Sequence, residues 1–168
     1  MSAPSAEGRA LRDALGQFAT GVTVVTTVTA AGEPAGITVN SFTSLSLSPP
    51  LVLWNLGQYS ANWDAFQDVT HFAIHVLAAD QEPLALAFSH PGGDPFAGLQ
   101  VDKGLGGLPL LSGVLAQFEC QVMHRYPGGD HEMLIGEVLD YREFDGEPLL
   151  FYRGNFGRFR HHTRPWKT

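Results

Sequence analysis

Short strand-like runs bounded by turn residues recur along this chain, and they constrain its fold more than any other feature. Residues 21–29 are rich in β-branched side chains and residues 51–56 are almost entirely apolar, as is typical of buried strands. Residues 114–122 alternate apolar and polar side chains, which predicts a strand with one face toward a core. Further strands are predicted over residues 35–39, 71–77, 131–141 and 149–152.

Helix signals are fewer and shorter than strand signals. The apolar spacing of residues 11–18 predicts an amphipathic helix that ends at Gly21. Two further helices are predicted over residues 61–67 and 81–88, with N-caps at Ser60 and Asp80. Because most strands are joined by short turns, the sequence predicts a mainly β fold, a Greek-key-like antiparallel barrel with a few peripheral helices.

The overall composition limits the organisation of the chain. Its 168 residues are 44% hydrophobic and 16% charged, which is typical of one globular domain. We expect a single domain over residues 1–168, with a core of about 11–156 and peripheral tails at 1–8 and 157–168. Residues 89–113 are rich in glycine and proline, which predicts a long irregular loop.

Charge and cysteine content exclude several functional classes. The net charge is −7 and no Lys or Arg cluster is present, which disfavours binding to a nucleic-acid backbone. No signal peptide or membrane-length apolar run is seen, so we expect no membrane partner. The one cysteine, Cys120, lies in a strand-like run and is predicted to be a buried thiol, in keeping with a cytoplasmic location.

Familiar enzyme motifs are absent. The chain has no GxSxG, P-loop or HExxH motif. Seven histidines suggest a metal site, but His71 and His75 on one predicted strand lack a third ligand by spacing. The pair at 161–162 lies near a terminus, and no metal site is predicted.

Three local features are candidates for binding. More than half of residues 36–50 are Ser, Thr, Asn or Gly, although the segment lies between apolar strands. This composition suits a neutral cradle for a heterocycle or phosphate, and it equally fits a polar loop without a ligand. His131 follows a Gly-Gly-Asp turn at the head of a strand, where it is either a barrel-rim contact or an exposed turn residue. Residues 153–156 close the last strand with an arginine, either as part of a site or as a solvated strand end.

Several blocks, taken in order, resemble a known family. Residues 11–156 resemble the short-chain flavin reductases, which have an FMN-binding split β-barrel fold and are the small partners of two-component flavin monooxygenases. The blocks that carry the resemblance are residues 18–26, 36–46, 72–77, 115–120, 129–131 and 149–154.

The resemblance implies positions for two cofactors. The flavin ring is expected against residues 38–45, and its phosphate near the start of the helix after Ser60. The implied flavin-binding residues are Thr38, Val39, Asn40, Ser41, Phe42, Ser44, Leu45, Ser60, Ala61, Asn62, Trp63, Phe88, Ser89 and His90. The implied nicotinamide contacts are His131, Tyr152, Arg153 and Gly154.

The resemblance also implies an activity. Hydride is expected to pass directly from NADH, or less readily NADPH, to FMN or FAD, without an essential catalytic residue. The product would diffuse to a flavin-dependent monooxygenase, and the protein would be a homodimer. Residues 59–62 lack the Lys or Arg that the family often carries beside the phosphate, so the choice between FMN and FAD stays open. His75 stands where the family often has Asn, and it is assigned no role.

Two alternatives follow from the same residues. The first is a flavin-binding carrier without a nicotinamide site. The second is a barrel of the pyridoxine-phosphate oxidase type, which the ten unclustered Lys and Arg residues disfavour.

Overall fold

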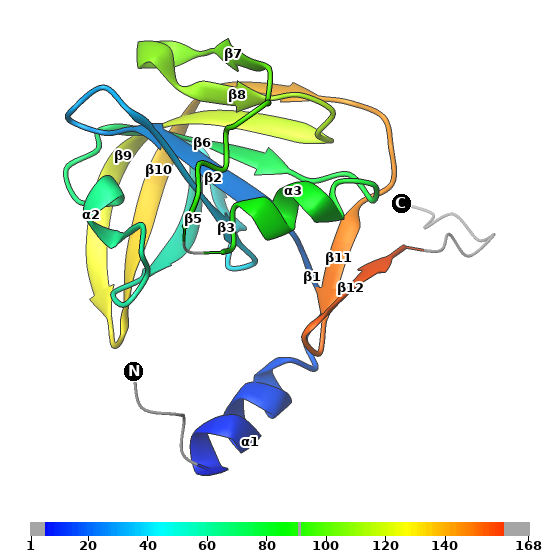
Figure 1. The fold of residues 1–168 in the computed structure, drawn as a ribbon. Coiled ribbons are helices and arrows are strands. Elements are labelled where there is room, and N and C mark those ends of the chain that lie inside the picture. The colour runs from blue at the N-terminus through cyan, green and yellow to red at the C-terminus, as the bar shows by residue number, and fades with distance from the viewer. Residues whose placement is uncertain (1–5, 91, 160–168) are drawn as a thin grey trace.

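A seven-stranded antiparallel sheet forms the body of the protein. The computed structural model describes residues 6–90 and 92–159. Within these residues the sheet curls around a core, with one layer of short elements on its outer face (Figure 1). Its strands, in spatial order, are β3 (Pro34–Val39), β2 (Thr23–Val28), β6 (His71–Val76), β9 (Ala116–Gly128), β10 (His131–Glu143), β5 (Pro50–Gly57) and β4 (Thr43–Leu47).

Two smaller sheets, three short α-helices and the 3₁₀ helix η1 (Leu105–Gly107) complete the described fold. One sheet has the order β1 (Thr20–Gly21), β11 (Leu149–Tyr152) and β12 (Asn155–Arg158), and the other pairs β7 (Val101–Lys103) with β8 (Pro109–Leu111). The helices are α1 (Ala6–Leu15), α2 (Trp63–Phe66) and α3 (Glu82–Ala87), and α1 stands off the main sheet beside the β11–β12 turn (Figure 1). The predicted mainly antiparallel β fold with few helices is confirmed. No helix among the described residues is long and apolar enough to span a membrane.

Aromatic side chains fill the inside of the curled sheet. The Trp54 ring meets those of Phe66 and Phe72 edge-on, at centroid distances of 5.2 Å and 5.9 Å. A second apolar cluster, which includes Phe88, lies beneath α3 on the other face of the sheet. Strand β6 is therefore buried on both faces, which explains its continuous apolar character.

Strand β9 differs from its prediction because its second face is also covered. Gln117 and Glu119, expected to face solvent, are 7% and 5% exposed beneath the β7–β8 hairpin. Gln117 Nε2 donates to the Leu111 carbonyl at 2.7 Å, and Glu119 Oε2 accepts the Leu105 N–H at 2.5 Å. The predicted irregular loop over 89–113 is thus wrong in its second half, where a hairpin closes over these polar groups.

The predicted ends of several elements are also wrong. Helix α1 ends at Leu15, and Gly21 belongs to β1, where it pairs with Leu150. Helix α2 is only four residues long, its N-cap is Asn62, and α3 begins after Gln81 and not after Asp80. Strand β12 extends past the expected core limit at 156. The tail residues 1–5 and 160–168, with the histidine pair at 161–162, lie outside the described residues.

Candidate functional site

The polar segment over 36–50 is mostly strand, and only residues 40–42 and the turn at Ser48 and Pro49 lie outside the strands. Strand β3 pairs as far as Val39, and β4 begins to pair at Thr43. The expected polar connector is therefore shorter than predicted. Because residues 40–42 lie outside both strand ladders, their backbone amides are not used in strand pairing.

Hydrogen bonds fix this connection at both ends. Ser41 Oγ accepts the Asn55 N–H at 3.0 Å and lies 3.4 Å from the Asn55 carbonyl. Thr38 Oγ1 donates to the Ala85 carbonyl at 2.7 Å, and the Thr38 N–H donates to the Phe88 carbonyl at 3.1 Å. The segment is thereby held between β5 and α3, and both hydroxyls already bond within the protein.

The first cleft at this segment brings together several of the predicted residues, and we call it the His131 cleft. Its volume is about 380 Å³. It is lined by Ile37, Thr38, Val39, Asn40, Ser41, Asn55, Gly57, Tyr59, Ser60, Asp130 and His131. Residues more than 90 positions apart in the sequence therefore share one surface.

Asp130 orients the His131 ring in this cleft. His131 Nδ1 lies 2.7 Å from Asp130 Oδ1, and because a carboxylate only accepts, Nδ1 carries the proton and donates. The pKa of Asp130 lies below its ordinary value, mainly because of this hydrogen bond. Nε2 is left on the side of Gly57, which pairs with His131 in the sheet. The His131 side chain is half exposed, at the cleft and not on a free turn.

Two more clefts adjoin the same segment. The Ser89 cleft, about 350 Å³, is lined by Val22, Thr38, Val39, Asn40, Leu86, Ser89, Phe151, Gly154 and Phe156. The α1 cleft, about 550 Å³, is lined by Arg12, Asp13, Leu15, Gly16, Phe18, Thr20, Asn40, Phe151, Arg153 and Gly154. Asn40 lines all three clefts, so they meet at one residue.

The predicted nicotinamide contacts do not gather in one place. Tyr152 Oη donates to Gln17 Oε1 at 2.9 Å, and the Arg153 N–H donates to the Gly16 carbonyl at 3.1 Å. These bonds join the β11–β12 turn to the end of α1. Arg153 and Gly154 therefore line the α1 cleft, whereas His131 lines the neighbouring one.

Several predicted flavin contacts lie outside the His131 cleft. Phe42 and Trp63 pack against the core, and Phe88 is buried with its ring 4.9 Å from that of Phe96. Ser89 Oγ and His90 Nδ1 each bond to the carbonyl of Leu86. Four others do not line any of the three clefts: Ser44, Leu45, Ala61 and Asn62.

The expected anion site near Ser60 lies at the start of a very short helix. Helix α2 has only four residues, so few peptide dipoles add along its axis. Ser60 Oγ accepts the Asn62 N–H at 3.1 Å and is partly used inside the turn. Any phosphate near Ser60 would rest on neutral donors.

Sequence reasoning missed several residues that build the site. Asp130 had an available signal, because a carboxylate directly precedes His131. Gln17 and Asn55 had none, since the Gln17 contact joins residues 135 positions apart. Gly57 gives room beside the His131 ring, where an added Cβ would lie 3.5 Å from Nε2.

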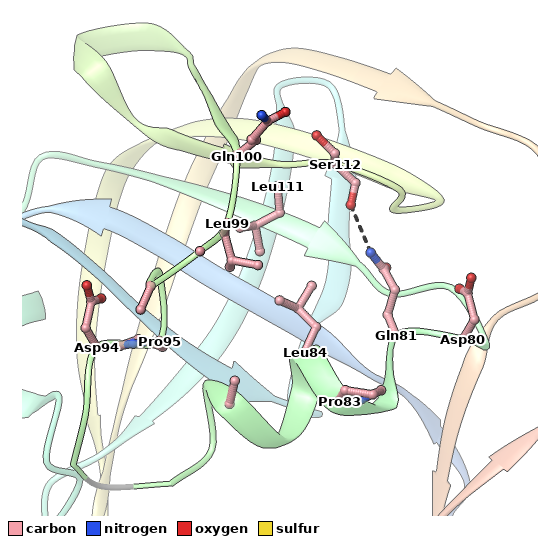
Figure 2. A pocket seen from close by; sticks show the side chains of 13 residues that line it. Asp80, Gln81, Pro83, Leu84, Asp94, Pro95, Leu99, Gln100, Leu111 and Ser112 are labelled. Atoms are coloured by element: carbon pink, nitrogen blue, oxygen red, sulfur yellow. Dashed lines mark hydrogen bonds between the residues drawn. The ribbon is translucent and has the colours of Figure 1, made fainter.

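A further cleft contains none of the predicted site residues. It lies between α3 and the segment before β7, has a volume of about 620 Å³, and has a floor rich in leucine (Figure 2). Gln81 at its rim donates to the Ser112 carbonyl at 2.9 Å (Figure 2). Its side-chain oxygen accepts the Ala78 N–H at 3.0 Å. Its amide is satisfied by the protein, so this cleft presents little directed chemistry. Within residues 6–90 and 92–159, no group of three or more His, Cys, Asp or Glu side chains is placed to hold a metal ion.

Comparison with known proteins identifies the family of this chain. The family model of the flavin reductase like domain matches residues 15–160. The FMN reductase (NADH) SmoA of Agrobacterium fabrum is 50% identical over 151 residues, which cover 90% of this chain and 86% of that protein. The reductase component of the flavin-dependent trigonelline monooxygenase of Acinetobacter baylyi is 43% identical over 88% of this chain. The chain spans only 48% of that relative.

A solved structure shows the same fold. The NADH:FAD oxidoreductase SgcE6 of Streptomyces globisporus, in complex with NAD and FAD fragments, superposes with a TM-score of 0.88 at 38% identity. The match covers 98% of this chain and all of that one. The expected split-barrel architecture is confirmed by this likeness.

Proposed function

The chain belongs to the flavin reductase like family, and from this we propose that it reduces flavin with NADH, less readily with NADPH. The observation that carries the proposal is the His131 cleft, which unites residues 37–41, Ser60 and His131. The names of relatives support it, since SmoA is an FMN reductase (NADH). We also propose that residues 1–168 act as one domain.

The protein's part in the reaction is binding and orientation. A bound flavin supplies at N5 the acceptor for a hydride and its two electrons from nicotinamide C4, so no protein acid or base is required. The backbone of residues 40–42, outside the strand ladders, offers neutral dipoles to the polar edge of the ring. Asp130 holds the His131 ring so that Nε2 is available to the nicotinamide.

The fit to flavin is consistent with the residues present. The His131 cleft carries two titratable side chains at its rim, Asp130 and His131, and the phenol of Tyr59, while its other lining is neutral. We propose that either FMN or FAD is accepted, because Ser60 and its neighbours offer no cation that would select one phosphate arrangement. A steady-state assay that crosses FMN, FAD and riboflavin with NADH and NADPH measures this preference directly.

One variant tests the placement of the nicotinamide. His131→Ala is expected to raise the KM for NADH several-fold while leaving flavin affinity nearly unchanged, because the ring is proposed to touch the nicotinamide only. Stopped-flow mixing with flavin and NADH should show loss of flavin absorbance near 450 nm in the parent protein. His124→Ala, which removes an exposed histidine from β9, is the matched control.

Two outcomes would contradict the proposal. Equal effects of His131→Ala on NADH and flavin would refute the placement of the nicotinamide. A parent protein that binds flavin but leaves NADH unoxidised would be a flavin carrier.

We further propose two partners. Relatives are reductase components of monooxygenases, which supports diffusive transfer of reduced flavin to a flavin-dependent monooxygenase. Homodimer formation is supported by apolar side chains left exposed on the sheet, above all Leu47 at 94% exposure on edge strand β4. Light scattering of the parent protein and of Leu47→Asp measures the oligomeric state, and a monomeric parent would refute the dimer.

A further inference from the structure

We propose that the α1 cleft binds the adenosine diphosphate half of a dinucleotide and that Asp13 there selects an adenosine ribose without a 2′-phosphate. The inference rests on the proposed flavin reductase function. It assigns new roles to Arg12, Asp13 and Phe18 of the N-terminal segment and to Arg153 of the β11–β12 turn.

The cleft is a built feature and not a chance gap. Its volume of about 550 Å³ lies in the range of ligand pockets. Its two walls are tied together by the Arg153 N–H to Gly16 carbonyl bond and by the Tyr152 to Gln17 bond. Arg153 (φ 48°) and Gly154 (φ 79°) are the two central residues of the turn that joins the paired Tyr152 and Asn155, as a two-residue β-hairpin requires, and this turn holds Arg153 at the cleft.

The charges in the cleft suit a diphosphate. Arg12 from α1 and Arg153 from the β11–β12 turn both line it. Guanidinium groups bind phosphate oxygens through paired, charge-assisted hydrogen bonds. The His131 cleft, which Ser60 lines, contains no arginine or lysine. The arginines therefore lie in the α1 cleft.

Thr20 also lines the cleft, and its buried Oγ1 has no hydrogen-bond partner in the protein. Buried polar groups are rarely left unpaired. Because the atom is buried, a phosphate or ribose oxygen in the cleft would reach it only after the Thr20 side chain rotates.

An aromatic wall suits the adenine ring. Phe18 is 79% exposed although it lines the cleft, so one face of its ring is available for stacking. Base stacking on an aromatic side chain is favourable for any base. Phe151 on the opposite wall is already packed against Phe156, at a centroid distance of 5.4 Å.

Asp13 gives the cleft its selectivity. A carboxylate near two guanidinium groups would repel a third phosphate, yet it can accept a hydrogen bond from a ribose 2′-hydroxyl. NADH and FAD have an unmodified adenosine ribose, whereas NADPH carries a 2′-phosphate. The arrangement therefore disfavours NADPH.

The position of the cleft connects it to the reaction. Asn40 lines both the α1 cleft and the His131 cleft, so one dinucleotide can extend from one to the other. NADH and FAD share the adenosine diphosphate half, and the experiment separates these two sources.

Binding of the isolated half is the first test. Calorimetric titration of the flavin-free protein with ADP-ribose should show binding. Arg12→Gln should raise the dissociation constant about tenfold, which corresponds to a loss of roughly 1.4 kcal/mol of binding free energy. Arg142→Gln, an exposed arginine that lines a different cleft, should bind as the parent does. Absent binding of ADP-ribose to the parent at millimolar concentration, or equal binding by Arg12→Gln, would overturn the inference.

Kinetics then identify the source of the adenosine diphosphate. If it belongs to NADH, Arg12→Gln raises the KM for NADH about tenfold and leaves the KM for reduced nicotinamide mononucleotide unchanged, with FMN or FAD alike. If it belongs to FAD, the same variant raises the KM for FAD and not for FMN. Normal flavin reduction with none of these effects would refute the cleft assignment and leave the proposed function intact.

A second variant tests the selectivity. Asp13→Asn should improve binding of 2′-phospho-ADP-ribose relative to ADP-ribose by about tenfold, since one repelling charge is removed. Improvement of both ligands by the same factor would show that Asp13 sets only the general charge, and the selectivity claim would fall.

Discussion

The buried ring of His75 should make the stability of this protein depend on pH in a measurable way. His75 lies on β6 with no exposed surface; its Nδ1–H donates to the Val24 carbonyl at 3.1 Å, and Nε2 has no partner. Burial lowers the pKa of His75 from 6.5 to about 4, and the hydrogen bond to Val24 opposes this only in part. The folded protein therefore keeps a neutral ring where the unfolded chain would bind a proton.

The sign and size of the effect follow from this pKa difference. As pH falls below 6.5, the unfolded state binds more protons than the folded state, so the free energy of unfolding decreases. Each pH unit is worth about 1.36 kcal/mol, and the interval from 6.5 to about 4 spans about two and a half units. The His75 contribution should therefore destabilise the protein by roughly 3 kcal/mol at pH 4. The lowered pKa of Asp130 acts in a more acidic range, below its ordinary value of 3.8.

Urea denaturation followed by tryptophan fluorescence at pH 7, 6, 5 and 4 measures the effect. His75→Asn should have a lower free energy of unfolding at pH 7 but a flatter pH dependence than the parent. His71→Asn, on the same strand but only partly buried, should keep the parent slope. Parallel curves for the parent and His75→Asn would refute the reasoning, because the slope would then come from other groups.

Two further changes test the packing around the site. Gly36→Ala places a Cβ 2.5 Å from Phe88 Cε1 and should lower the free energy of unfolding by about 1–3 kcal/mol. Gly21→Ala, the control, has open space around the added Cβ and should leave the free energy of unfolding unchanged. Equal melting temperatures for the two variants would contradict this. Arg125→Gln removes the guanidinium that donates to the Phe66 carbonyl at 2.8 Å and should lower the free energy of unfolding by about 1–3 kcal/mol. Urea denaturation measures this change. An unchanged midpoint would show that water replaces the guanidinium.

The strands that sequence reasoning found are those with a buried face. Strands β2, β5 and β6 carry regular apolar runs because the core lies against them. Strand β4 was missed because four of its five residues are exposed, so no apolar alternation marks it. The β7–β8 hairpin was missed for a related reason, since its role is to cover polar side chains of β9.

The site was predictable where it depends on neighbours in the chain and not where it depends on the fold. Residues 38–41 and His131 were expected to share a surface, and the structure joins them in one cleft. His131 and Arg153 were expected at one mouth, but Arg153 is bound to the end of α1. The contact between Arg153 and Gly16 spans more than 130 positions and leaves no local signal in the sequence. The placement of Arg153 and His131 in different clefts is therefore seen only in the folded chain.

The division of charge between the adjoining clefts fits the proposed direct hydride transfer, in which no catalytic side chain takes part. The His131 cleft is largely neutral and built around backbone that is free of strand pairing, which suits a ring whose charge changes when it is reduced. The α1 cleft holds Arg12, Asp13 and Arg153, which suits phosphate groups whose charge stays fixed. Oriented backbone dipoles beside the ring stabilise the charge that it gains on reduction, without a fixed cation. Placing the charges one cleft away, across Asn40, allows tight binding of a dinucleotide without biasing the ring that accepts the hydride.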